Sequence, residues 1–193
     1  MLILGALVLI LFLFLGIGWG YLKYEQSQIN MGELEKLQTA RALWDQRSFT
    51  DYEMTVHYAY YLEEPCDRTL KYESEKDWVI IIKNDCLPIP DVQPYSVVVM
   101  FDTIEHWLTD EYKCGINGCE CDGPIIVKGE YDATYGFPIS FQAIPDEAQR
   151  WKYMKYWQNY IDGIFSSKTV VVCYLLGTSY PSFEITSFTP ITP

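Results

Sequence analysis

The sequence predicts an α+β protein with a single N-terminal transmembrane helix (residues 1–22), a helical stalk (residues 23–48) and a domain (residues 49–193). The domain is expected to hold a mostly antiparallel sheet of about six strands with helices on one face. Two observations predict this organisation. The first 22 residues carry no charge, and 18 of them are apolar, whereas all 14 Lys and Arg and all 26 Asp and Glu follow them. From about residue 52, the hydrophobic pattern changes from a helical period to the alternation of strands.

The uncharged segment is long enough to cross a bilayer, because about 20 residues at about 1.5 Å each span about 30 Å. A cleaved signal peptide is the alternative, and Gly16-Ile17-Gly18 offers the small-x-small pattern of a cleavage site. We favour a retained signal anchor, because the apolar run exceeds the roughly 7–15 residues of a signal peptide and no Lys or Arg precedes it. Trp19, Tyr21 and Tyr24 would then lie at the membrane–water interface.

The stalk is predicted from helical spacing over residues 23–48. Long side chains recur there every three or four positions, at Leu34, Leu37, Arg41 and Trp44. One continuous helix would carry the domain away from the bilayer. Alternatively, Asn30 caps a separate helix, with Glu33 in the capping-box position.

The first half of the domain begins with an expected hairpin. Residues 52–62 alternate, with Met54, Val56 and Tyr58 on one face. Residues 77–83 (DWVIIIK) form a continuous apolar run that is typical of a strand covered on both faces. The polar residues 63–76 between them are predicted to be turn.

The second half is expected to begin with a helix over residues 96–108, capped by Ser96. A stripe on that helix holds Val97, Met100 or Phe101, Ile104 and Leu108. The remaining expected elements are a Gly- and Cys-rich loop at 114–124, strands at 124–132 and 136–144, a helix at 145–164, and strands at 168–176 and 182–188.

Several stretches resemble a bacterial family of unknown function, whose members are small exported or lipid-anchored α+β domains with a YDxxxGxP motif. The similar segments are ALWDQRSFTDYEMTV, VVMFDTIEHWL, VKGEYDATYGFPISF and FEITSFTP. The motif residues here are Tyr131, Asp132, Gly136 and Pro138. The resemblance implies an exported domain and supplies no catalytic residue. The chain differs from the family in lacking a lipobox cysteine and in an aromatic insertion over roughly residues 146–178.

The motif itself is predicted to build a turn. Gly136 permits a positive φ, Pro138 fixes φ at the start of a strand, and Asp132 can accept N–H groups of the turn. A ligand-binding role for Asp132 is the alternative.

Six cysteines point to disulfides and an oxidising compartment, with the domain on the extracytoplasmic side as a periplasmic or extracellular domain. The candidates are Cys66, Cys86, Cys114, Cys119 and Cys121, and Cys173 is either a partner or a small core residue. Six cysteines allow 15 full pairings, so the pairing stays open. Unpaired thiols and a metal site are alternatives, although the C-x4-C-x-C spacing fits neither a ferredoxin cluster nor a usual zinc site.

The sequence indicates no enzyme and no cofactor. His57 and His106 lie beside no nucleophile motif, and the chain contains no G-x-S-x-G, H-E-x-x-H, Walker loop or G-x-G-x-x-G sequence. A net charge of −12 and a pI near 4.5 exclude a dedicated nucleic-acid binder.

The 16 Tyr and six Trp exceed the ordinary needs of a core of this size and suit interfaces instead. The candidate interface is Trp151, Tyr153, Tyr156, Trp157 and Tyr160. We therefore expect a single-pass accessory subunit of a larger membrane complex, of which a respiratory or photosynthetic assembly is one example. Its partners would be other membrane protein subunits and, through residues 1–22, the lipid bilayer. A stand-alone membrane-tethered exported domain that binds a ligand or protein is the alternative. A pilin-like filament subunit is a third reading, but the basic leader of pilins is missing.

Overall fold

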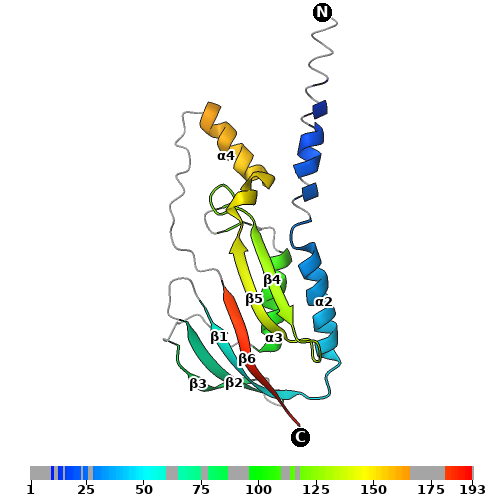
Figure 1. Cartoon of the computed structure of the whole chain (residues 1–193), viewed down its shortest axis with the longest axis vertical. Helices are drawn as coiled ribbons and strands as arrows, with labels where there is room; N and C mark the ends of the chain where they lie inside the picture. Colours follow the sequence, from blue (N-terminus) through cyan, green and yellow to red (C-terminus); the bar gives the residue numbers. More distant parts are fainter. Residues whose placement is uncertain are drawn as a thin grey trace, which may run out of the picture. The chain divides into compact units, whose positions relative to one another are not determined.

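The computed structural model describes residues 10, 13–14, 16–22, 24–25, 28–59, 65–74, 78–86, 96–109, 114–115, 118–165 and 181–192. Its helices are α2 (Met31–Asp45), α3 (Val97–Thr109), the 3-10 helix η2 (Glu147–Lys152) and α4 (Met154–Phe165). Its strands are β1 (Asp51–Tyr58), β2 (Cys66–Glu73), β3 (Trp78–Asn84), β4 (Ile125–Tyr131), β5 (Pro138–Pro145) and β6 (Ser182–Ile191), as labelled in Figure 1.

The chain divides into two compact units. Unit 1 comprises Met1–Met31, Cys114–Ile125 and Pro145–Tyr174, and unit 2 comprises Gly32–Lys113, Ile126–Ile144 and Leu175–Pro193. Unit 2 therefore holds nearly all of the sheet together with α2 and α3, while unit 1 holds the described N-terminal residues, the cysteine-rich loop, η2 and α4.

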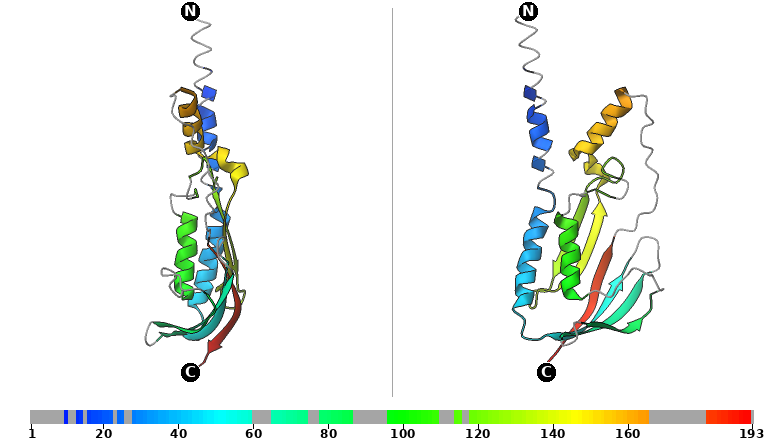
Figure 2. Two further views of the ribbon diagram at one scale, coloured as in Figure 1. Left: turned by 90° about the vertical axis from the view of Figure 1, so that its left-hand side faces the viewer. Right: turned by 180° about the vertical axis from the view of Figure 1, so that it is seen from behind.

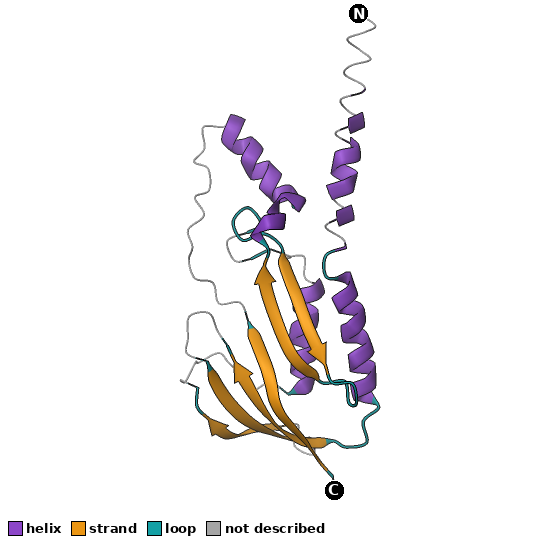
Figure 3. Cartoon of the chain, in the orientation of Figure 1, coloured by secondary structure: helices purple, strands orange, loops and turns teal. Residues whose placement is uncertain are grey.

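The sheet has six strands in the order β3-β2-β1-β6-β5-β4, which confirms the predicted α+β class (Figure 3). Strand β1 pairs antiparallel with β2 and with β6, and β2 pairs antiparallel with β3. The last strand of the chain thus lies between β1 and β5, where it joins the two halves of the sheet.

The predicted hairpin between residues 52–62 and 77–83 is wrong, because strand β2 lies between them. Residues 66–73 were expected to be turn because they are polar, but residues 66–72 pair with β1 without interruption. Arg68 is only 4% exposed, and its Nε donates to Asn84 Oδ1 at 2.9 Å. A polar strand is stable here because its buried charge has a partner. The strand predicted at 168–176 lies outside the described residues.

Strand β3 was expected to be covered on both faces, and this is also wrong. It is the edge strand of the sheet next to β2, and Ile81 and Ile82 are exposed. A continuous apolar run does not distinguish a central strand from an edge strand.

The core lies between one face of the sheet and helices α2 and α3, which Figure 2 shows on the same side. On β1 the predicted alternation is confirmed, because Met54, Val56 and Tyr58 are buried together with Tyr52. The Tyr52 ring packs at 5.5 Å from Trp44 of α2, and its hydroxyl accepts the N–H of Val97 at the start of α3. One tyrosine therefore contacts both helices.

Helix α2 corrects the stalk prediction for residues 31–45. Leu37, Ala40 and Trp44 are buried in unit 2, so this helix is a core element rather than a free-standing spacer. It begins separately, after Asn30 with φ 66°. Glu33 does not form the expected capping box, since its carboxylate pairs with Lys36 at 2.6 Å and accepts the N–H of Gly129 at 3.4 Å.

Helix α3 agrees closely with the sequence prediction. The buried residues are Val97, Met100, Phe101, Ile104 and Leu108. Ser96 Oγ accepts the N–H of Val99 at 3.3 Å, which is the predicted N-cap.

The single helix predicted over residues 145–164 is broken into η2 and α4. Tyr153 adopts an extended conformation (φ −99°, ψ 133°) between them. Asp146 caps η2 by accepting the N–H of Ala148 at 3.1 Å.

Among the residues that the structure describes, no helix is both long enough and apolar enough to cross a bilayer. The predicted membrane span is therefore not seen as such a helix in this part of the chain.

Candidate functional site

The YDxxxGxP motif forms a turn that packs on helix α2. Asp132 Oδ1 accepts the N–H groups of Thr134 at 2.9 Å and Tyr135 at 2.6 Å. Gly136 has φ 82°, and a Cβ there would lie 2.2 Å from the carbonyl oxygen of Ala40. The carboxylate of Asp132 and the missing side chain of Gly136 thus build this turn and allow it to approach the helix.

The other two motif residues complete the same structure. Tyr131 stacks on Phe101 with ring centroids 6.4 Å apart, and Pro138 is buried at the start of β5. The Tyr131 hydroxyl is buried without a hydrogen-bond partner in the described part of the chain. Burial raises the pKa of this hydroxyl, and the nearby charge of Glu33 raises it further.

The cysteines form disulfides, whose pairing the spacing alone left open. Cys66 is bonded to Cys86, with Cα atoms 5.0 Å apart, and Cys114 to Cys119, with Cα atoms 4.8 Å apart. Cys121 is disulfide-bonded as well. Because these sulfurs are in disulfides, they do not offer thiolates to a metal.

The loop around Cys114–Cys119 packs against the start of η2 within unit 1. Asp146 donates its N–H to the carbonyl of Pro124 at 2.8 Å. Gly123 has φ 74°, and a Cβ there would lie 2.3 Å from the Asp146 carbonyl oxygen. The loop therefore holds the beginning of η2 through backbone contacts.

The five residues of the predicted aromatic interface do not share one surface. Tyr153 is 3% exposed, and burial raises the pKa of its hydroxyl. Tyr156 and Trp157 are half-buried and pack edge to face at 5.3 Å. Trp157 Nε1 also donates to the carbonyl of Trp151 at 2.6 Å. Trp151 and Tyr160 are exposed.

Three further apolar residues of α4, outside the predicted interface, are exposed. Ile161, Ile164 and Phe165 are 50%, 60% and 83% exposed on α4. The spacing of Trp157, Ile161 and Ile164 could have predicted this exposed apolar side for a helix that begins at Met154.

Two polar contacts bind the residues that follow the uncharged segment to the rest of unit 1. Glu25 Oε2 pairs with Lys152 Nζ at 3.0 Å, and both side chains are largely covered. The hydrogen bonds from Lys152 and Tyr21 lower the pKa of Glu25. Asn30 Nδ2 donates to the carbonyl of Ile125 at 2.9 Å.

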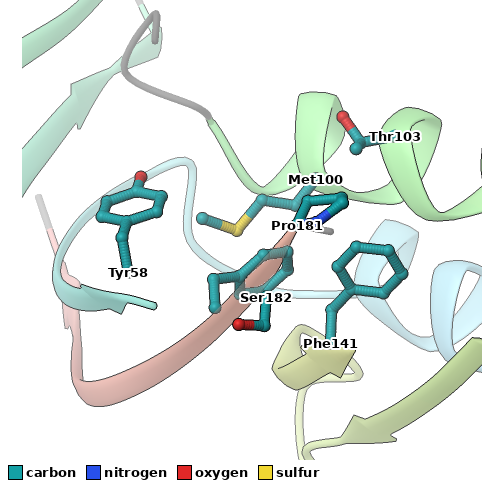
Figure 4. A pocket seen from close by; sticks show the side chains of 7 residues that line it. Tyr58, Met100, Thr103, Phe141, Pro181 and Ser182 are labelled. Carbon is teal, nitrogen blue, oxygen red and sulfur yellow. The ribbon is translucent and has the colours of Figure 1, made fainter. Parts of the chain in front are cut away.

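Unit 2 has a small apolar pocket between β1, α3, β5 and the start of β6, where Tyr58, Met100 and Phe141 contribute side chains (Figure 4). Its volume is about 30 Å³, which is room for about two water molecules. The interface between sheet and helices is thus nearly filled at this point.

The possible metal ligands in the described part of the chain include both histidines and the acidic residues. His57 Nδ1 lies 2.7 Å from Asp67 on the outer face of the sheet. No group of three or more His, Cys, Asp or Glu side chains in the described ranges is placed to hold a metal ion.

Comparison of the chain with family models, with curated proteins and with solved structures finds no match. The resemblance to the bacterial family with the YDxxxGxP motif therefore stays a prediction.

Proposed function

We propose that the protein is a non-catalytic accessory subunit of a larger membrane complex, anchored by residues 1–22 as a single span, with its domain on the extracytoplasmic side. The observation that carries this proposal is the attachment of the residues after the span to unit 1. Glu25 pairs with Lys152, and Asn30 donates to Ile125. Such contacts suit a subunit that holds neighbours in a fixed geometry, whereas a flexible tether needs none.

The anchor is supported by the amino acids at the start of the chain. Large apolar side chains among the described residues there are exposed, at Ile10, Leu13, Phe14 and Ile17. A surface of this kind is costly in water and stable in lipid. The aromatic residues Trp19, Tyr21 and Tyr24 follow it, as expected at a membrane–water interface.

The extracytoplasmic side is supported by the disulfides, because the cytoplasm of most cells keeps thiols reduced. Two bonded pairs hold separate parts of the chain, Cys66–Cys86 in unit 2 and Cys114–Cys119 in unit 1.

A stand-alone tethered domain that binds a small ligand is the second candidate. It would need an open apolar pocket with a few polar groups. The pocket beside Tyr58 and Phe141 in unit 2 has room for about two water molecules, which is too small for such a ligand.

The test is affinity purification of the full chain from native membranes in mild detergent. The proposal expects membrane proteins to co-purify in fixed proportion. A monomer without partners would contradict it.

The Glu25–Lys152 pair provides a matched set of variants for the same experiment. Lys152→Glu should reduce the amount of co-purifying protein, and the exchanged pair Glu25→Lys/Lys152→Glu should restore it. Lys155→Glu is the control, because Lys155 lies 3.7 Å from Glu120 and is well exposed. Equal yields from all variants would show that the attachment of the anchor does not matter.

A further inference from the structure

We propose that helix α4 is an interfacial membrane helix, whose apolar side lies at the boundary between lipid headgroups and acyl chains beside the N-terminal span. This inference rests on the proposed anchoring by residues 1–22. It assigns the lipid bilayer as the partner of the surface that α4 exposes.

The side chains of α4 are distributed so that apolar and polar residues lie on opposite sides. At about 100° per residue, one side of the helix carries the apolar and aromatic residues. They are Met154, Tyr156, Trp157, Tyr160, Ile161, Ile164 and Phe165. Lys155, Asn159 and Asp162 lie on the opposite side. This pattern is typical of a helix that lies in the plane of a membrane surface.

The apolar side of α4 is exposed to solvent. No residue of α4 is buried, and large apolar side chains are among the exposed ones, with exposed fractions of 60% for Ile164 and 83% for Phe165. A helix of 12 residues is marginal in water unless its apolar side packs on something. The exposed aliphatic side of α4 therefore requires an apolar environment.

Within unit 1, the start of α4 is connected to the residues that follow the uncharged segment. Lys152, two residues before α4, pairs with Glu25, three residues after the uncharged segment ends. In Figure 1 and in the right-hand view of Figure 2, α4 is inclined to the helical residues 16–22, and its C-terminal end leans away from them. With residues 1–22 in the bilayer, the Glu25–Lys152 pair holds the start of α4 at the interface, and the inclined helix lays its apolar side against the lipid.

The charges around α4 do not favour binding to anionic lipid. Two of the cations near α4 have anionic partners, Lys152 with Glu25 and Lys155 with Glu120. A third, Arg150, lies over the Tyr156 ring, 5.8 Å from its centroid. The chain as a whole carries −12. Attraction to anionic lipid is therefore not the basis of the contact, and burial of apolar area is.

The experiment places a nitroxide label at single positions of the full chain in phosphatidylcholine nanodiscs. The labelled variants are Ile164→Cys on the apolar side, Asn159→Cys on the polar side as the matched control, and Leu13→Cys in the uncharged segment. Electron paramagnetic resonance then compares the collision rates of each label with oxygen, which concentrates in lipid, and with a water-soluble nickel chelate.

The proposal expects the oxygen-to-nickel ratio at position 164 to be several-fold higher than at position 159, and unchanged by added phosphatidylserine. A water-like ratio at 164 would overturn it. Protection of position 164 from both reagents would also overturn it, since a protein neighbour would then cover α4.

The label at Leu13 separates this inference from the proposed function. A lipid-like ratio at 13 with a water-like ratio at 164 would leave the anchor standing and exclude the interfacial helix. A water-like ratio at position 13 would contradict the anchor itself.

Discussion

At the scale of single residues, the hydroxyl groups of Tyr52 and Tyr131 have different roles. Tyr52 OH accepts the N–H of Val97 at 2.9 Å, whereas Tyr131 OH is buried without a partner among the described residues. Tyr52→Phe should lower the free energy of unfolding by about 1–3 kcal/mol, because it leaves the Val97 N–H unsatisfied. Tyr131→Phe should be neutral or stabilising. Urea denaturation of both variants tests the pair, and equal losses would contradict the hydrogen-bond assignment.

Gly136 is the residue at which the backbone tolerates a side chain least. Its φ is 82°, and a Cβ would overlap the Ala40 carbonyl oxygen at 2.2 Å. Gly136→Ala should cost more than about 2 kcal/mol, from the left-handed conformation and the backbone overlap together. The control is Gly32→Ala in α2, where nothing lies within 4 Å, and it should gain up to about 1 kcal/mol. Thermal unfolding measures both, and a tolerated Gly136→Ala would show that the turn is not packed on α2 as described.

Asp51 makes stability depend on acidic pH. Its Oδ1 accepts hydrogen bonds from the Ser74 hydroxyl at 2.6 Å and the Ser74 N–H at 3.0 Å. These bonds hold the pKa of Asp51 below its ordinary value of 3.8. Because the folded pKa is lowered, the stabilisation is present above pH 3.8 and is lost as the pH falls through the folded pKa.

Ser74→Ala should therefore raise the pKa of Asp51, which a carboxyl NMR titration measures. Thr50→Ala is the control and should raise it less, since the Thr50 hydroxyl is 3.2 Å away. An unchanged Asp51 pKa in Ser74→Ala would rule out Ser74 as the cause.

At the scale of elements, the two described disulfides close loops of different length. Cys66–Cys86 spans 20 positions and joins the start of β2 to the end of β3, whereas Cys114–Cys119 spans five. By loop-closure entropy, Cys66→Ala/Cys86→Ala should cost about 3 kcal/mol and Cys114→Ala/Cys119→Ala about 2 kcal/mol. Denaturant titration of each double variant measures these losses. A larger loss from the short loop would show that its packing against Asp146, rather than chain entropy, dominates.

Elements with a strong local pattern were predictable, and elements that depend on distant partners were not. The stripe of α3 and the alternation of β1 follow from residue spacing, since each buries one face. Strand β2 was missed because it buries Arg68, whose hydrogen-bond partner Asn84 lies 16 positions away in the sequence. The break at Tyr153 was missed because it depends on a contact between distant residues. The Asp146 N–H before η2 donates to the Pro124 carbonyl of the cysteine-rich loop.

The candidate interface was predictable only in part, for the same reason. Aromatic composition pointed to residues 151–160, but burial of Tyr153 and exposure of Phe165 depend on where α4 begins. Because Tyr153 is extended, α4 is not in helical phase with the residues before it. Its exposed side therefore differs from that of one continuous helix from Pro145.

At the scale of the whole molecule, the disulfides and the proposed anchor together predict the orientation of the domain. Because none of the described cysteines is free, a membrane-impermeant maleimide should leave the protein unlabelled on intact cells. After treatment with an impermeant phosphine reductant, it should label the protein. A cytoplasmic protein of the same cells is the control and should stay unlabelled throughout. Labelling only after lysis would place the domain inside the cell and reverse the proposed topology.

The sequence by itself determined the properties that depend on neighbouring residues along the chain. These are the uncharged first 22 positions, the acidic remainder, the α+β class and the faces of β1 and α3. The tertiary structure decided which cysteines pair, that β3 is an edge, and that α2 belongs to the core. The physical reason is that periodicity reports only that a side chain needs burial, whereas the partner that buries it comes from distant parts of the chain.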